Sequence, residues 1–373
     1  MKIRCAKERL VEGLSLVSRT VSNRTPLPIL ECILLMASED GLKLMANDLE
    51  MSIETAALEA EVMTPGSVAL EARLFSEIVR KMPGDDILIE TKENNETLCV
   101  SGRAKFTIMG MPGEEFPVTP GVEREKGYTV SSKDFRDMIR QTIFSVAVED
   151  SKPVLTGELI QHRDNVLNMV AVDGFRISYR RMELPESPAS PEIPISVVVP
   201  AKALHELSRI LPVEEEDSLS FYFTDKRIVF DLPQFTFVSR LLEGEFIRYD
   251  QIFNEDFTTN VTVDRQIFLR GLERATLVAR ENKKSPVKFE ITDQSVIITS
   301  NTEMGAVYDE VSAEVDGSVM EIAFNPRYLI EALRAIEEDK IVARFTTGLS
   351  PCIIRGVQND AAKYLILPLR LRG

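Results

Sequence analysis

The chain has 373 residues, 44% of them hydrophobic, and a formal net charge of −15. This length is enough for several hydrophobic cores, whereas no apolar run approaches the ~18 residues of a membrane span. The beginning, Met1-Lys2-Ile3-Arg4, does not resemble a signal peptide. Four scattered cysteines without a C-x-x-C pair favour free thiols in a reducing compartment, and the two histidines argue against a zinc site. We therefore expect a cytoplasmic protein without membrane partner, metal or cofactor.

An amphipathic pattern opens three parts of the chain, first at residues 6–14. Similar segments occur at 131–139 and 264–272, each after a short alternating stretch. Apolar residues recur in them at i, i+4 and i+7 or i+8, which is the period of a helix with one buried face. The spacing predicts a strand followed by a helix at the start of each of three units.

A second pattern, [Lys/Arg]-x-[Leu/Phe]-x-Glu-x-x-Arg, occurs at residues 73–80, 202–209 and 327–334. By subtraction, its starts lie 129 and 125 residues apart, which indicates one unit of roughly 125 residues written three times. The pattern predicts a second helix in each unit, with a basic residue near both of its ends.

The remaining segments are short, alternate in polarity and are rich in β-branched and aromatic residues, which favours strands. Turn-forming residues at 39–41, 173–174 and 316–317 are typical of meanders. With two helices against many strands per unit, the predicted class is α+β, as three tandem repeats of one domain in which two helices pack on antiparallel sheets. The clearest predicted strands are 87–90, 98–101, 219–223, 287–291, 296–299 and 340–345.

Two linkers separate the units. Residues 111–127 are rich in Pro, Gly and Glu, and residues 243–260 form the second linker, whereas the Pro- and Ser-rich stretch 184–196 is interpreted as a surface loop. The expected domains are therefore an N-terminal one at 1–124, a central one at 125–253 and a C-terminal one at 254–373.

Charge is distributed unevenly along this acidic chain. The six predicted helical segments together carry +10, which leaves −25 for the rest; they are residues 7–24, 72–82, 131–145, 200–211, 264–284 and 325–336. Solvated helix faces often carry Lys and Arg. A positive net charge on each of the six segments, however, suits a protein that surrounds a polyanion. No Trp, helix-turn-helix or single-strand motif indicates base readout. We expect weak, mobile, sequence-independent binding to duplex DNA.

Several motifs carry a resemblance that covers the whole chain. They are residues 24–30, 47–51, 101–103, 172–176 and 325–328 and the ending 364–371. In these the chain resembles the bacterial DNA polymerase III β subunit, the sliding clamp. The resemblance implies the DNA-clamp fold and a head-to-tail homodimeric ring around duplex DNA. It also implies a processivity factor without catalysis of its own, placed at the nucleoid during replication.

The resemblance also implies surfaces for DNA and for the second copy. The basic positions expected to bind DNA are Arg24, Arg73, Arg80, Lys81, Lys202 and Arg209. At one end of the dimer contact, an edge strand is expected to use Arg103, Lys105, Phe106 and Ile108. The other end is expected to use Leu277 and Val278 on the first helix of unit three, with Glu303 nearby. Without the resemblance, Phe106 and Ile108 also fit ordinary core-facing alternation.

The family binds its partners through one apolar groove between units two and three. These partners are the replicative polymerase, the clamp loader, repair polymerases, ligase and mismatch-repair proteins. A groove of Leu, Ile and Pro with Arg at its rim fits a short peptide with Leu and Phe anchors. Without the resemblance, the C-terminal stretch reads as a plain edge strand. The matching positions are Leu155, Val172, Gly174, Phe175, Arg176, Ile177, Ile247, Ile252, Leu365, Leu367, Pro368, Leu369 and Arg370.

The chain departs from the family at some of these places. Glu149, Pro153 and Val154 stand where relatives carry Gln and two tyrosines implicated in DNA contact, Ala201 replaces a basic residue, and Phe175 replaces a His.

Two alternative functions remain, a three-domain scaffold that is not a clamp and a carboxylate-based hydrolase. For the hydrolase, Asp173 would act with Glu149 and Asp150. The sequence offers it no phosphate-binding glycine loop, Gly-x-Ser-x-Gly or Cys/His pair.

Overall fold

The computed structural model describes residues 1–22, 25–119, 124, 127–148, 152–184, 195–214, 217–253, 256–278, 286–303 and 305–370. Within them lie six α-helices and four sheets, and the strand pairs are antiparallel. The α+β class predicted from the sequence is therefore confirmed.

The chain divides into two compact units. Outside residues 185–194, which are not described, one unit comprises residues 1–133 and 209–241. The other comprises 134–184, 195–208 and 242–373. The expected central domain contributes to both units, and its boundaries at 125 and 253 stay a prediction.

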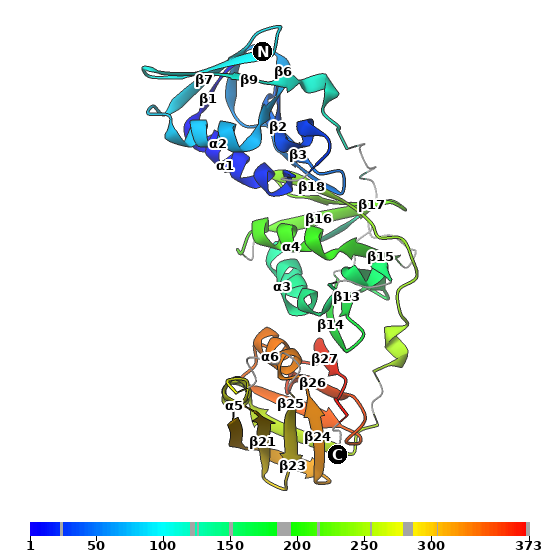
Figure 1. Ribbon diagram of the computed structural model, residues 1–373. Coiled ribbons are helices and arrows are strands. Elements are labelled where there is room, and N and C mark those ends of the chain that lie inside the picture. The colour runs from blue at the N-terminus through cyan, green and yellow to red at the C-terminus, as the bar shows by residue number, and fades with distance from the viewer. Residues whose placement is uncertain are drawn as a thin grey trace. The chain divides into compact units, whose positions relative to one another are not determined.

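The first unit contains two sheets (Figure 1). Its larger sheet has nine strands and runs on from β4 to β18, where Met51 pairs with Ser239. In spatial order the smaller sheet is β5 (Ala60–Thr64), β1 (Lys2–Ala6), β7 (Asp86–Thr91), β8 (Glu96–Ser101) and β9 (Ala104–Met109). The larger is β10 (Met111–Pro112), β6 (Gly66–Glu71), β2 (Cys32–Ser38), β3 (Gly41–Asn47), β4 (Met51–Thr55), β18 (Phe235–Arg240), β17 (Arg227–Asp231), β16 (Ser218–Phe223) and β11 (Tyr128–Ser131).

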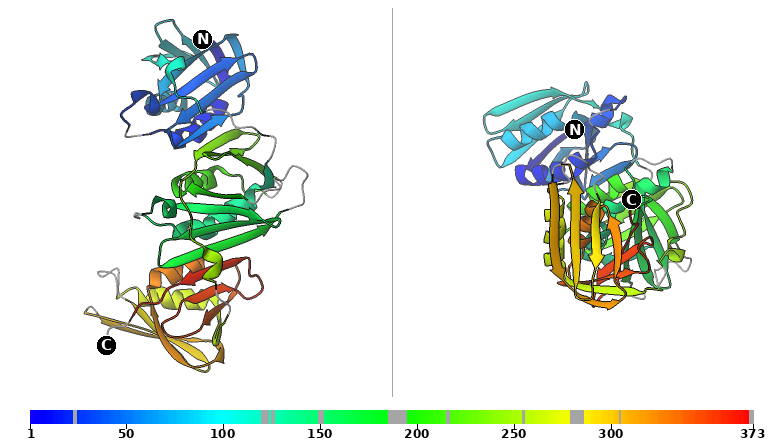
Figure 2. Two further views of the ribbon diagram at one scale, coloured as in Figure 1. Left: turned by 90° about the vertical axis from the view of Figure 1, so that its right-hand side faces the viewer. Right: turned by 60° about the horizontal axis from the view of Figure 1, so that its bottom comes forward.

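The second unit repeats this plan with a nine-stranded and a four-stranded sheet. In the right view of Figure 2, the gold to orange strands of the four-stranded sheet lie in front. The nine strands are β15 (Ile195–Pro200), β12 (Gly157–Arg163), β13 (Val166–Val172), β14 (Arg176–Glu183), β27 (Ala362–Ile366), β26 (Cys352–Gly356), β25 (Lys340–Phe345), β19 (Thr259–Asp264) and β23 (Glu314–Gly317). The four are β22 (Gly305–Ser312), β21 (Ser295–Thr302), β20 (Val287–Ile291) and β24 (Met320–Phe324).

The strand predictions are confirmed, and one turn prediction is wrong. All six predicted strands lie in β7, β8, β16, β20, β21 and β25. Residues 39–41 and 173–174 do connect consecutive antiparallel strands. Residues 316–317, in contrast, lie within β23, where Gly317 pairs with Thr259 of β19. The Asp-Gly dipeptide was misleading because Gly317 has a φ of +130° inside the strand, without making a hairpin there.

Both repeated sequence patterns form helices. The first gives α1 (Lys7–Val17), α3 (Ser132–Thr142) and α5 (Arg265–Ala275), and the second gives α2 (Ala72–Lys81), α4 (Ala201–Ile210) and α6 (Pro326–Ala335). Helix α1 packs on β3, β4 and α2, and α5 packs on β21, β22 and α6. The expected helical stretch 264–284 is shorter than predicted, because α5 ends at Ala275, and residues 279–285 lie outside the described part.

The second pattern is helical because each of its positions has a physical role. Its Leu or Phe position is fully buried, as Phe75, Leu204 and Leu329 show. Its first basic position stays exposed, at 88% for the side chain of Arg73. A carboxylate before α2 accepts the first free backbone N–H groups, since Glu71 binds those of residues 73 and 74 at 3.1 and 2.6 Å.

The cysteines are part of the cores. Cys5, Cys32, Cys99 and Cys352 are free and buried. Burial raises the pKa of the Cys5 and Cys32 thiols to about 11 and that of Cys99 to about 12. In the described part of the chain, no helix is long and apolar enough to cross a membrane.

Candidate functional site

The turn between β13 and β14 lies at the centre of the predicted groove. Asp173 organises it, because its Oδ1 accepts the backbone N–H of Phe175 at 2.9 Å and that of Arg176 at 3.1 Å. Gly174 between them has a φ of +84°. The turn leaves Phe175 57% exposed, which makes its side chain available to a ligand.

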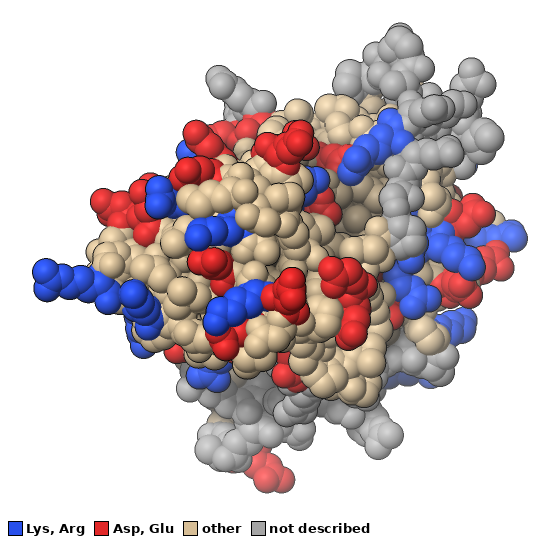
Figure 3. Space-filling model, turned by 90° about the horizontal axis from the view of Figure 1, so that it is seen from above, with Lys and Arg blue, Asp and Glu red and all other residues tan. Residues whose placement is uncertain are grey.

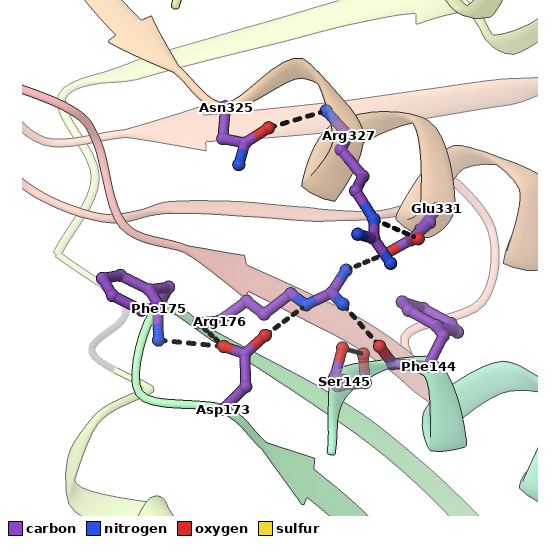
Figure 4. Close-up of polar contacts among 9 residues, drawn as sticks. Phe144, Ser145, Asp173, Phe175, Arg176, Asn325, Arg327 and Glu331 are labelled. Carbon is purple, nitrogen blue, oxygen red and sulfur yellow. Dashed lines mark hydrogen bonds and ion pairs between the residues drawn. The ribbon is translucent and has the colours of Figure 1, made fainter. Parts of the chain in front are cut away.

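Arg176 lies beneath this turn and is only 5% exposed. Its Nε donates to Asp173 Oδ2 at 2.9 Å, its Nη1 to a carboxylate oxygen of Glu331 and its Nη2 to the Phe144 carbonyl oxygen (Figure 4). The guanidinium also stacks over Tyr328, with 4.4 Å to the ring centroid. A buried cation needs this many partners, so Arg176 lies under the turn, and of the two arginines predicted for the groove Arg370 is the exposed one.

Helix α6 supplies part of the site that sequence reasoning missed. The ring of Tyr328 stacks on that of Phe175, with 6.3 Å between centroids and 21° between planes. Glu331 binds both Arg176 and the exposed Arg327, whose Nε lies 2.9 Å from Glu331 Oε1. The signal was present: Tyr328 stands in a motif that carries the family resemblance, and Glu331 is the glutamate of the second repeated pattern.

Five predicted groove residues gather in one apolar cluster with residues from the loop after β18. Leu155, Val172, Ile177 and Leu365 are buried there, and Ile247 packs against them partly exposed. These side chains therefore form a floor more than an open surface. The sequence-based prediction missed other members, namely Ala147, Val154, Leu159, Val170, Tyr179, Val198, Leu242, Phe246, Tyr249, Phe253, Phe257 and Ile353.

The last described residues continue the site beyond β27. Strand β27 lies between β14 and β26, so the edge-strand alternative for it is wrong. After it, the Leu367 N–H donates to the Phe175 carbonyl oxygen at 2.9 Å, and the Leu369 N–H donates to that of Ala323 at 2.7 Å. Phe175 and Leu367 are thus neighbours, and Leu367 is 38% exposed. Of the other predicted residues, Ile252 and Arg370 are exposed, and Pro368 and Leu369 are partly buried.

The predicted DNA-binding residues lie on helix surfaces where they are described. Arg73, Arg80 and Lys81 are exposed on α2, as are Lys202 and Arg209 on α4, whereas Arg24 lies outside the described residues. A cavity of about 360 Å³ beside α2 is lined by Arg73 and Arg80, but also by Glu31, Glu71 and Glu77. Figure 3 likewise shows acidic and basic side chains interspersed on the face it draws. The mixed charge of the cavity beside α2 is unsuited to binding a phosphate group tightly.

The residues expected at the dimer contact lie at two sheet edges. Strand β9 is the edge of its sheet, with Phe106 42% exposed, Arg103 and Lys105 exposed, and Ile108 half-buried. Leu277 is exposed and Val278 half-buried, but both follow α5 and are not on it, because that helix ends at Ala275. Glu303 is exposed. The sequence-based prediction missed the edge strand β22, on which Tyr308 is 67% exposed; the alternation at 305–312 could have indicated it.

The positions that depart from the family have mixed placement. Val154 is buried in the apolar cluster, Pro153 beside it is exposed, and Glu149 lies outside the described residues. Of the carboxylates considered for catalysis, Asp173 is engaged by the turn and Arg176, and Asp150 also lies outside the described residues. Among described residues, no group of three or more His, Cys, Asp and Glu could hold a metal.

Comparison with known proteins gives one consistent result. Residues 1–120, 129–247 and 250–370 match the N-terminal, central and C-terminal domains of the DNA polymerase III beta subunit. The beta sliding clamp of Bacillus subtilis (strain 168) is 33% identical over 382 residues, covering 99% of this chain and 100% of the relative. A putative DNA polymerase III beta subunit from Eubacterium rectale has a crystal structure with a TM-score of 0.95 at 38% identity, over 100% of both chains. The sliding clamp structure from Bacillus subtilis also has a TM-score of 0.95, at 33% identity over the same full coverage. The chain therefore belongs to the family of DNA polymerase III beta subunits, the beta sliding clamps.

Proposed function

We propose that this sliding clamp closes around duplex DNA as a head-to-tail homodimer and tethers partner proteins through the surface around Phe175. Its role is tethering, without catalysis of its own. The observation that carries the proposal is the presence of two unlike, exposed sheet edges, β9 and β22.

The two edges complement one another. An unpaired edge strand offers backbone N–H and C=O groups to a further strand. Arg103 is exposed beside β9 and Lys105 is exposed on it, whereas Glu303 is exposed beside β22 and Glu310 on it. Each edge also exposes an aromatic ring, Phe106 on one and Tyr308 on the other. Opposite charges and unlike partners favour a heterologous contact, which closes into a ring when the rotation fits two copies.

Binding to DNA is expected to be weak and topological. Exposed Arg and Lys on α2 and α4 attract phosphates without reading bases. Arg73 is partly neutralised by its own helix, since its Nε lies 3.6 Å from Glu77 Oε1. Such helices keep a duplex near them while leaving it free to slide.

Partners are expected to bind at the turn 173–175 and the chain end. Exposed Phe175 and Leu367 border the buried apolar cluster, and aromatic and aliphatic anchors contribute most of the energy of a short-peptide interface. The proposed partners are the replicative polymerase, the clamp loader, and repair polymerases, ligase and mismatch-repair proteins, each through a peptide with Leu and Phe anchors.

Retention on circular DNA tests the ring. Clamp assembled on a nicked circular plasmid should stay with the plasmid through gel filtration and leave it after linearisation. Phe106→Ala should abolish retention. Losing the phenyl group costs on the order of 3 kcal/mol per interface, or roughly a hundredfold in dimer affinity. Met63→Ala is the matched control, since Met63 is 41% exposed on β5, the opposite edge of the same sheet. Retention that survives linearisation would contradict encirclement.

A peptide titration tests the partner surface separately. Phe175→Ala and Leu367→Ala should each weaken a fluorescein-labelled Leu/Phe-anchored peptide about tenfold or more in fluorescence polarisation. Leu349→Ala is the control, because Leu349 is 74% exposed in the same unit but lies in the loop between β25 and β26. Equal affinity of all three variants would place the partner site elsewhere.

A further inference from the structure

The turn between β3 and β4 repeats the backbone of the groove turn. Asp48 Oδ1 accepts the backbone N–H of Glu50 at 3.0 Å and that of Met51 at 2.8 Å. The Asp48 N–H donates back to the Met51 carbonyl oxygen at 3.1 Å. Leu49 between them has a φ of +72°. Residues 173–176 make each of these contacts in the same order, with the positive φ at Gly174.

A neighbouring strand end completes both sites in the same way. The Arg240 N–H donates to the Glu50 carbonyl oxygen at 2.8 Å, as the Leu367 N–H does to that of Phe175 at 2.9 Å. Glu50 therefore corresponds to Phe175, and Arg240 corresponds to Leu367. The first unit holds a copy of the proposed peptide site in which the two exposed apolar residues are replaced by charged ones.

This copy contains a small cavity of about 100 Å³. The turn at residues 47–52 lines it, and so does the linker at residues 117–119. Asn47 Nδ2 donates to the Pro117 carbonyl oxygen at 2.8 Å, and the Ser52 and Thr119 hydroxyls lie 2.8 Å apart. The linker is thus bonded in place as a wall, so that a ligand meets a preorganised site.

Cations dominate the charge of the cavity. Arg227 and Arg240 line it together with one carboxylate, that of Glu50. Arg240 Nη1 lies 3.5 Å from Glu50 Oε1, and both side chains are more than half exposed, so this ion pair is weak. No ion pair of the Arg227 side chain is found among the described residues. An incoming carboxylate could therefore bind both guanidinium groups.

Apolar side chains flank the cations. Leu49 is 48% exposed and Val118 is 63% exposed, and both line the cavity. A left-handed backbone is unfavourable for a leucine, whereas glycine at the same position of the groove turn adopts it without strain. Strain of this kind concentrates at functional surfaces.

We propose that this first-unit site docks a short protein segment in which an Asp or Glu side chain stands next to an apolar residue. The carboxylate binds Arg227 and Arg240, and the apolar neighbour packs on Leu49 and Val118. The site's kinship to the groove rests on the proposed function, but its ligand differs, because charge replaces the aromatic and aliphatic anchors.

A peptide fits these features better than nucleic acid does. The cavity has room for one carboxylate and not for a run of phosphates, and Glu50 repels a polyanion. Bases would also need aromatic rings to stack on, whereas the exposed apolar side chains here are aliphatic.

The probe is a fluorescein-labelled heptapeptide, Gly-Ser-Leu-Asp-Leu-Ser-Gly, titrated with the full chain in fluorescence polarisation. Its counterpart carries Asn in place of Asp and should bind about tenfold more weakly or worse. The double variant Arg227→Ala with Arg240→Ala should lose a similar factor. Lys226→Ala, which removes one positive charge next to Arg227 but outside the cavity lining, should keep the affinity.

Competition separates this site from the groove. A Leu/Phe-anchored peptide should bind the double variant normally and should not displace the acidic probe. Equal affinity for the Asp and Asn peptides, displacement by the Leu/Phe peptide, or displacement by an equimolar single-stranded oligonucleotide would each overturn the proposal. So would self-association that the double variant abolishes, since a second copy would then be the occupant. If the Leu/Phe peptide fails to bind as well, the proposed groove is wrong too.

Discussion

The two turns, 47–51 and 172–176, have the same backbone conformation, but the side chains beneath them are of opposite kinds. Under the first, Met51 is a buried apolar side chain at 3% exposure. Under the second, Arg176 is equally buried but is held by two carboxylates, a carbonyl oxygen and an aromatic ring. Apolar burial needs only shape, whereas a buried cation needs every partner in place. The second turn is therefore tied to α6, which supplies Glu331 and Tyr328, and the position of Phe175 depends on that helix.

The largest expected effect comes from breaking the charged support. Arg176→Ala should lower the free energy of unfolding by about 3–5 kcal/mol, because half-buried Asp173 loses its cation, Glu331 keeps only the exposed Arg327, and the packing of the guanidinium is lost. Urea unfolding measures the loss. Met51→Ala, which only opens an apolar cavity, should cost less, about 2 kcal/mol.

A double-mutant cycle tests whether the ion network causes this difference between the two turns. If the ion network is the reason, Arg176→Ala and Glu331→Ala should be strongly non-additive in a double-mutant cycle. A smaller loss for Arg176→Ala than for Met51→Ala would show that the network contributes little to the second turn.

A second contrast concerns β2 and β12, the strands that precede β3 and β13 in the chain. The second residue of β2 is the fully buried Ile33, whereas the second residue of β12 is Glu158, also fully buried. Neither Glu158 carboxylate oxygen has a hydrogen-bond partner among the described residues. Burial raises the pKa of Glu158 to about 8, against a smaller opposing effect of the Thr142 hydroxyl, which itself donates to the Met138 carbonyl oxygen.

This buried acid should make stability depend on pH. Since the folded pKa is raised, the folded state keeps a proton that the unfolded state releases above pH 4.5, and stability falls as pH rises from there to about 8. The slope is at most about 1.4 kcal/mol per pH unit. In urea midpoints measured from pH 5 to 8, Glu158→Gln should flatten this slope. An unchanged slope would assign the dependence to other groups.

The smallest expected effect comes from exchanging the residues with positive φ in the two turns, Leu49 and Gly174. Leu49→Gly should stabilise the first unit, and Gly174→Leu should destabilise the second, each by about 1 kcal/mol. No heavy atom lies within 4 Å of a Cβ built on Gly174, so strain and not collision is expected to decide the sign. Thermal melts of the two single variants measure it, and shifts of the same sign in both would contradict the assignment.

Local patterns predicted the elements well, but not what their side chains meet. The strands and helices follow from alternation and helical period, which act over a few residues. The support of Arg176 does not, because its partners Phe144 and Glu331 lie 32 and 155 residues away in sequence. Nothing in the sequence around Arg176 therefore indicates that its side chain is buried. Leu277 was misplaced for a local reason, since nothing in the pattern marks the end of α5 at Ala275.

The burial of all four thiols makes the chain convenient for chemical labelling. Reaction with maleimides and iodoacetamides requires an accessible thiolate, and the pKa values of Cys5, Cys32 and Cys99 are raised to about 11 or above. A single cysteine introduced on the surface, for instance on β9 or β22, should then react selectively in the native protein without removal of the natural ones. Dyes or crosslinkers placed in this way could report on the opening and closing of the proposed ring directly.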